Sequence, residues 1–210
     1  MVRKDIKQFL KTIPENITLV AACKYVDAQD IHVLFDNGVH NIGENRVEDF
    51  LKKYDELSTL PITWHFIGHL QRNKAKYVAN KIDFLHSLDS IQLAKKLSSL
   101  RNKPLKVFIE ISINNEPTKN GVNLDQIETF LQELMPIPNI DIVGLMMMAK
   151  QNSTESQLES QFQSLVDLRN KLEKEFDIKL PYLSMGMSDD YKIAIKKGAT
   201  HIRLGRILFE

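Results

Sequence analysis

The sequence predicts an α/β protein that forms a single (β/α)8 TIM barrel. Short apolar runs alternate with longer amphipathic segments along the 210 residues, a pattern typical of βαβ units around a parallel sheet. The chain contains eight such runs, the number of strands that closes this kind of barrel. An open doubly wound sheet is the alternative, but the chain lacks the G-x-G-x-x-G dinucleotide fingerprint.

The apolar runs are expected to be strands and the amphipathic segments helices. Several runs are continuously apolar, as in strands that are buried on both faces. The expected strands cover residues 18–24, 40–43, 63–67, 84–88, 106–113, 141–148, 182–187 and 201–205. The expected helices cover residues 4–12, 28–37, 45–57, 73–80, 91–100, 127–134 and 155–176, and a last segment that runs to Gly198.

Polar residues just before the apolar stripes mark where helices begin. Ser90 is expected to cap the helix that starts at residue 91, and Asn123 with Gln126 has the spacing of a capping box. Ser188 or Asp189 is expected to cap the last helix. These signals fix the order of helices between the strands.

The composition predicts a cytoplasmic protein of one domain that spans residues 1–210. The 28 Lys and Arg residues balance 27 Asp and Glu residues, whereas nucleic-acid-binding proteins usually carry a basic surplus. A single cysteine, Cys23, excludes an internal disulfide framework and a cysteine-rich metal site. Residues 1–14 lack the apolar core of a signal peptide, and every apolar run is too short to span a membrane.

Lys24 is the first candidate for chemistry, because the active face of a barrel lies where its strands end. It closes the first apolar run. Partial burial at this place would depress the pKa of a lysine and make its amine nucleophilic toward an aldehyde. The alternative is a lysine whose stem packs on the rim while its ammonium group reaches water.

The ends of the seventh and eighth strands are candidates for binding phosphate. Barrels often bind phosphate with the loops after these strands. Gly205 would let the backbone approach a ligand closely, and Ser184 and Ser188 could donate hydroxyl hydrogen bonds. The alternative for Ser188 is a plain helix cap.

Arg203 lies within the last expected strand, where a charged side chain needs a partner. It could donate a hydrogen bond to the ring nitrogen of a bound cofactor, and the alternative is an ion pair across the barrel. His65 and His69 are four residues apart, but they fall on a strand and a glycine turn, so we expect no metal site.

Other polar residues are assigned to structure. His40, His86 and His201 fall at strand beginnings, the face of a barrel that is associated with stability. Asn45 is expected either to lie with Glu44 and Arg46 at the active rim after the second strand or to cap the helix that follows. Cys23 lies within a strand run, so we expect a small buried side chain and not a nucleophile.

Longer segments resemble a known family. Residues 64–78, Trp-His-Phe-Ile-Gly-His-Leu-Gln-Arg-Asn-Lys-Ala-Lys-Tyr-Val, are similar to the signature of the pyridoxal phosphate homeostasis protein family. Supporting segments follow in the family's order over nearly the whole chain, at residues 20–24, 43–46, 116–121, 186–190 and 202–205.

The resemblance implies a barrel like the N-terminal domain of alanine racemase that binds pyridoxal 5′-phosphate (PLP) as an internal aldimine. Lys24 matches the aldimine lysine. The other cofactor contacts map by position to Ser184 or Ser188 with Gly205 and Arg206 at the phosphate, Arg203 at the pyridine nitrogen, and Lys119 as an accessory contact.

The chain departs from the family pattern at two of these places. The family usually has Thr or Ser at position 206, so Arg206 either contacts the phosphate through its side chain or points outward and offers only its backbone N–H. Cys23 stands where the family often has Ser or Thr. Neither departure removes the aldimine lysine.

The resemblance implies a carrier that buffers or delivers PLP and has no established catalytic activity. The chain ends directly after the eighth expected strand, without the second domain that racemases use, and an arginine at the pyridine nitrogen weakens the ring as an electron sink. We expect a monomer whose partners are apo PLP-dependent enzymes or vitamin B6 salvage enzymes. The alternatives are a PLP-dependent enzyme acting on amino acids, such as a weak racemase, and a phospho-sugar enzyme that uses Lys24 without a cofactor.

Overall fold

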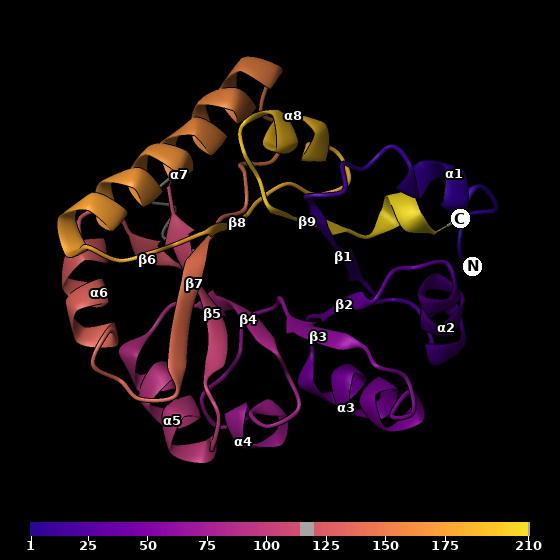
Figure 1. The fold of residues 1–210 in the computed structure, drawn as a ribbon, viewed down its shortest axis with the longest axis horizontal. Helices are drawn as coiled ribbons and strands as arrows, with labels where there is room; N and C mark the ends of the chain where they lie inside the picture. Colours follow the sequence, from indigo (N-terminus) through magenta and orange to yellow (C-terminus); the bar gives the residue numbers. More distant parts are fainter. Residues whose placement is uncertain (114–119, 210) are drawn as a thin grey trace.

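The computed structural model describes residues 1–113 and 120–209 and contains a closed barrel of eight parallel strands surrounded by helices (Figure 1). The barrel closes because β4 pairs with β5 and β1 pairs with β9. Its strands are β1 (Thr18–Ala22), β2 (Asn41–Glu44), β3 (Thr63–Phe66), β4 (Phe84–Leu88), β5 (Leu105–Ser112), β7 (Ile140–Met146), β8 (Tyr182–Ser184) and β9 (His201–Leu204). The predicted fold class is confirmed.

The helices follow the strands in the expected alternation. They are α1 (Ile6–Leu10), α2 (Ala28–Asp36), α3 (Val47–Glu56), α4 (Ala75–Val78), α5 (Ile91–Leu100), α6 (Ile127–Leu134), α7 (Glu155–Phe176), α8 (Tyr191–Lys196) and the 3-10 helix η1 (Arg206–Leu208). Strand 84–88 and helices 91–100, 127–134 and 155–176 have their predicted bounds, and the other elements differ from the prediction by a few residues at their ends.

The start of α6 differs from the prediction, whereas the start of α5 agrees with it. Asn123 belongs to an additional strand, β6 (Val122–Asn123), which pairs with β5, so the expected capping box with Gln126 does not form. Ser90 does cap α5, since its side chain accepts a hydrogen bond from the backbone N–H of Leu93 at 3.3 Å. Thr154 and Gln157 form a complete capping box at the start of α7.

Apolar side chains form two separate layers. The larger one lies between the strands and the surrounding helices, and a smaller cluster inside the barrel contains Phe84, Phe108, Val143 and Met146. Gly144 lets β7 and β8 approach, because a Cβ atom at this position would lie 1.9 Å from the carbonyl oxygen of Tyr182. The barrel is therefore filled by side chains.

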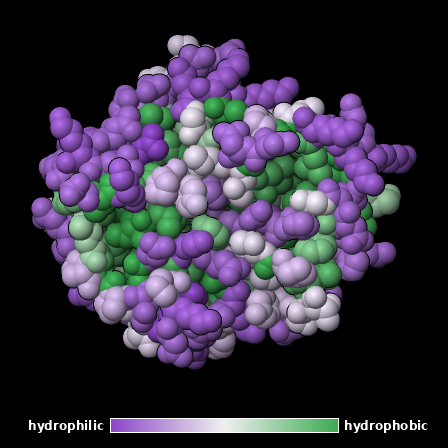
Figure 2. Space-filling model, viewed as in Figure 1, coloured by the Kyte–Doolittle hydropathy of each residue, from purple (hydrophilic) through white to green (hydrophobic). Residues whose placement is uncertain are grey.

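The two ends of the described chain meet beside α1 (Figure 1). Val2 and Phe209 form an antiparallel bridge, and the backbone N–H of Arg3 donates to the carbonyl oxygen of Leu208 at 3.0 Å. Figure 2 shows hydrophobic areas between hydrophilic side chains on one face of the molecule. None of the helices in residues 1–113 and 120–209 is long and apolar enough to cross a membrane.

Candidate functional site

The carboxyl ends of β1, β8 and β9 bring the predicted site residues to one end of the barrel. β1 pairs with β9 in a register that sets Ala21 opposite Leu204, so the residues that follow these two strands are neighbours. The backbone N–H of Gly205 donates to Ser188 Oγ at 3.3 Å, which connects the loops after β8 and β9. We call this region, with Lys24, the carboxyl-end site.

Lys24 lies two residues after the end of β1, and its side chain is exposed. The Nζ atom lies 4.9 Å from the ring centroid of Tyr25. The partial burial that the sequence suggested is therefore absent in the structure. An exposed amine remains accessible to an incoming aldehyde, which a covalent attachment at this position requires.

A buried ion pair supports the backbone next to Lys24. Lys53 Nζ, on α3, donates to the carbonyl oxygen of Cys23 at 2.5 Å and to the Glu44 carboxylate at the end of β2. Glu44 is fully buried, and this burial raises the pKa of its carboxyl group although the hydrogen bond from Lys53 lowers it. The pair anchors the point at which the chain leaves β1.

The loop after β8 differs from the expected helix start. Helix α8 begins at Tyr191, and neither Ser188 nor Asp189 caps it. Asp190 Oδ1 instead accepts from the backbone N–H of Met187 at 2.5 Å. Ser188 is left in the turn with its hydroxyl facing the Gly205 backbone, which is compatible with a phosphate-binding loop.

The Arg206 side chain lies over the outer, exposed side of this loop. Its guanidinium forms an exposed ion pair with Asp189 at 2.5 Å. Within the described part of the chain, the backbone N–H groups of Ser188 and Arg206 have no acceptor. Backbone donors are therefore better placed than the Arg206 side chain to hold an anion here.

Arg203 is buried inside the barrel and bonds to neutral acceptors. NH1 donates to the carbonyl oxygen and to Oγ of Ser184, at 2.8 and 2.6 Å, and NH2 donates to the carbonyl oxygen of Met147 at 2.9 Å. Burial lowers the pKa of Arg203 to about 10, against the opposing charges of Glu110 and Asp190. Among the described residues no carboxylate forms a salt bridge with it, so the alternative of a direct ion pair is not observed.

Ser184 and Glu110 lie deeper than residues on a solvent-exposed rim. Ser184 is fully buried, and its hydroxyl contacts both Arg203 and His86. Glu110, on β5, is 4% exposed; burial and the Asp89 carboxylate raise its pKa to about 7, against the lowering effect of Arg203. Glu110 was not predicted, because its inward direction depends on how the barrel closes.

Asn45 does not cap α3, so that one of its two predicted roles is not observed. Arg46, and not Asn45, precedes α3, and Asn45 Oδ1 is buried without a hydrogen-bond partner in the described structure. A buried acceptor of this kind is costly unless a ligand or water satisfies it. Three of the five N–H bonds of Arg203 are used within the protein, so two have no acceptor among the described residues. Together with these two N–H bonds, the Lys24 amine and the backbone donors at residues 188 and 206, Asn45 Oδ1 suits a ligand with an aldehyde, an aromatic ring nitrogen, a hydroxyl group and a phosphate.

Two other expectations concern metals and Lys119. The described residues contain no group of three or more His, Cys, Asp or Glu side chains that could hold a metal ion. His69 instead lies 3.3 Å from the Asp89 carboxylate. Lys119 lies outside the residues that the structure describes.

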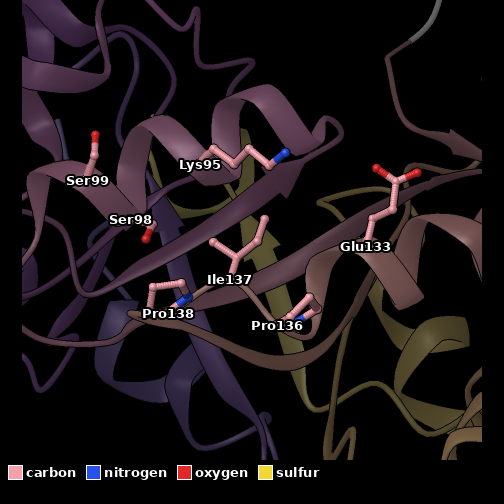
Figure 3. Close-up of a pocket in the computed structure, with 7 residues that line it drawn as sticks. All are labelled: Lys95, Ser98, Ser99, Glu133, Pro136, Ile137 and Pro138. Carbon is pink, nitrogen blue, oxygen red and sulfur yellow. The ribbon is translucent and has the colours of Figure 1, made fainter.

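A separate hollow of about 530 Å³ lies between α5 and the segment before β7. Figure 3 shows Lys95, Ser98 and Ser99 on α5, with Glu133 on α6 across the hollow. Ser98 and Ser99 are near the end of the helix that leads into β5, so the hollow lies toward the amino ends of the strands. It is distinct from the carboxyl-end site.

Comparison with known proteins identifies the family. The model of the alanine racemase N-terminal domain matches residues 3–210. The pyridoxal phosphate homeostasis protein of Aquifex aeolicus is 38% identical over 194 residues, which are 91% of this chain and 85% of that protein. The protein of the same name from Escherichia coli K12 is 34% identical over 93% of this chain and 86% of its own length.

The chain belongs to the pyridoxal phosphate homeostasis protein family. Among solved structures, PipY of Synechococcus elongatus PCC7942 with PLP bound is 30% identical, with a TM-score of 0.92, and the match covers 98% of this chain and 100% of that one. Alanine racemase from Corynebacterium glutamicum has a TM-score of 0.70 at 17% identity and is covered over 57% of its chain, a likeness of fold alone.

Proposed function

We propose that residues 1–210 form one PLP-binding domain that holds the cofactor as a Schiff base on Lys24 and takes part in intracellular PLP homeostasis by buffering and delivery. The observation that carries the proposal is the meeting of Lys24, Gly205 and Ser188 at the carboxyl end of a barrel of this family. Attachment would join Lys24 Nζ to the aldehyde carbon with the loss of one water.

The predicted site residues take different parts in this proposal. The backbone N–H groups at Ser188 and Arg206 and the loop at Gly205 would hold the phosphate, because the Arg206 guanidinium is paired with Asp189. Arg203 would donate to the pyridine nitrogen. Ser184, whose hydroxyl is already bonded twice, would position Arg203 and not contact the phosphate.

The function that we propose is that of a PLP carrier and not of a robust catalyst. When bound, PLP supplies an electron sink, and its strength depends on the partner of the ring nitrogen. The arginine is a donor that leaves this nitrogen unprotonated, whereas a carboxylate would favour the protonated ring. The exposure of Lys24 is compatible with release to other proteins. We infer a cytoplasmic monomer that serves apo PLP-dependent enzymes or vitamin B6 salvage enzymes.

A PLP-dependent enzyme acting on amino acids is the second candidate. It is favoured by Glu110, which lies near Arg203 and has a pKa of about 7, a value suited to general acid–base chemistry. Exchange of the α-proton of amino acids for deuterium separates the two functions. A carrier gives no exchange above the rate of free PLP, and an enzyme gives exchange that Glu110→Gln abolishes.

The attachment itself is tested by adding PLP to the purified protein and recording its visible spectrum. We expect a yellow protein whose absorption changes on borohydride reduction, and loss of both properties in Lys24→Ala. Lys150→Ala is the matched control, since Lys150 is an exposed lysine that follows β7 at the same end of the barrel. A colourless but folded wild-type protein would contradict the proposal and favour a barrel enzyme that works without a cofactor.

A further inference from the structure

A continuous chain of side-chain hydrogen bonds crosses the inside of the barrel from β2 to β9. Asn41 Oδ1 lies 3.0 Å from His65 Nε2, and His65 Nδ1 lies 2.8 Å from His86 Nε2. His86 Nδ1 lies 2.8 Å from Ser184 Oγ, which receives the 2.6 Å hydrogen bond from Arg203. The chain therefore links five strands and ends on Arg203.

Because both imidazoles are neutral, the acceptor at the Asn41 end fixes the direction of every hydrogen bond. The Asn41 carbonyl oxygen can only accept, so His65 Nε2 donates and His65 Nδ1 accepts. His86 Nε2 must then donate to His65, and His86 Nδ1 must accept from the hydroxyl of Ser184. Arg203 can only donate, so Ser184 Oγ accepts from it while giving its own proton to His86.

The surroundings keep both imidazoles neutral, as this arrangement requires. His65 and His86 are fully buried, and this burial is the main cause that holds the pKa of each well below its ordinary value. The titratable groups that face them are His201 and Arg203 on β9 and Lys106 on β5. Each of these groups, when charged, disfavours a positive charge on the imidazole that it faces.

The hydrogen-bond chain determines how the Arg203 guanidinium is held. Both NH1 hydrogen bonds go to Ser184, and a third goes from NH2 to Met147. Of the five N–H bonds of a guanidinium, two thus have no acceptor among the described residues. A protonated His86 would donate to Ser184 Oγ, and the serine proton would then turn toward Arg203 and oppose its hydrogen bond.

We propose that His65, His86 and Ser184 are positioning residues that orient the Arg203 guanidinium so that its remaining N–H bonds meet a ring-nitrogen acceptor in the carboxyl-end site. This inference deepens the proposed function, because it takes PLP as the ligand that supplies the acceptor. The hydrogen-bond chain itself exists in the protein without ligand, so it can be tested separately.

The first experiment uses ligand-free protein and nitrogen NMR of its histidine and arginine side chains. At pH 7 we expect His65 and His86 to be neutral and protonated on Nε2, with Arg203 N–H signals protected from exchange. Ser184→Ala should remove that protection. Ser87→Ala is the matched control, because Ser87 is a buried serine on β4 that donates to the Gly68 carbonyl oxygen and takes no part in the hydrogen-bond chain. An Nδ1 proton on either histidine, or equal protection in Ser184→Ala, would overturn the inference.

The second experiment loads the same proteins with PLP and follows the visible spectrum against pH. In Ser184→Ala and His86→Phe, borohydride should still fix the cofactor on Lys24. The pH at which the spectral change is half complete should shift by about one pH unit, which is the effect of weakening one hydrogen bond to a charged group. Ser184→Thr, which keeps the hydroxyl, should restore the wild-type midpoint and serves if the other variants fold poorly. An unchanged midpoint with normal loading overturns the positioning role alone, whereas failure of the wild type to load contradicts the proposed function.

Discussion

Replacing Glu110 by glutamine tests the electrostatics inside the barrel. The carboxyl group is 4% exposed, and burial with the nearby Asp89 raises its pKa from an ordinary 4.5 to about 7. A group with a raised pKa stabilises the fold fully below its unfolded-state pKa and loses this contribution as the pH rises through the folded-state pKa. For Glu110 the contribution is therefore present below pH 4.5 and lost above about pH 7.

The magnitude follows from the same two values. The interval from 4.5 to about 7, at 1.36 kcal/mol per pKa unit, corresponds to about 3 kcal/mol. Glu110→Gln keeps the shape of the side chain and removes its titration. Between pH 4 and pH 8.5 the free energy of unfolding of Glu110→Gln should therefore rise by about 3 kcal/mol relative to the wild type.

Urea unfolding followed by circular dichroism over this pH range measures the difference. Glu133→Gln is the control, since Glu133 is an exposed glutamate on α6 and its removal should change the profile little. Stability profiles of wild type and Glu110→Gln that stay parallel from pH 4 to pH 8.5 would refute the account of a buried, charged Glu110.

Three further predictions concern stability. Lys53→Met should destabilise the protein by about 3–5 kcal/mol in urea unfolding, because it leaves Glu44 buried and unpaired; a double variant with Glu44→Gln should recover much of the loss, and no recovery would argue against the pair. His201 has a pKa lowered to about 4, mainly by burial, so the wild type should lose about 3 kcal/mol between pH 7.5 and pH 4 that His201→Asn does not lose; equal acid sensitivity would contradict this. Thr154→Ala should cost about 1 kcal/mol by removing the capping box of α7, while Thr154→Ser should cost little; equal losses would speak against the cap.

The barrel was predictable because its signals are local. Helix α7 begins after a capping threonine and carries a leucine stripe, so both of its ends were predicted correctly. The strands are buried runs, and their number gave the closed barrel. The predicted start of α6 was wrong because strand pairing competed with capping. Asn123 pairs with β5 and therefore cannot cap this helix.

The inside of the barrel was not predictable from spacing. His86 was expected at the amino end of its strand as a structural residue, but it is the third residue of β4 and contacts Ser184 across the barrel. Which side of a buried strand faces inward follows from closure and register, and a continuously apolar run does not show it. The placement of Lys24 at the carboxyl end of the barrel could be predicted because its position after a strand is local, whereas its exposure follows from the loop.

The attachment of PLP to Lys24 is tested most directly by mass spectrometry of the loaded, borohydride-reduced and digested protein. The account predicts a pyridoxyl phosphate group on the peptide that contains Lys24 and none above background on the peptide that contains Lys150. A label distributed over exposed lysines, or concentrated on a lysine other than Lys24, would contradict it.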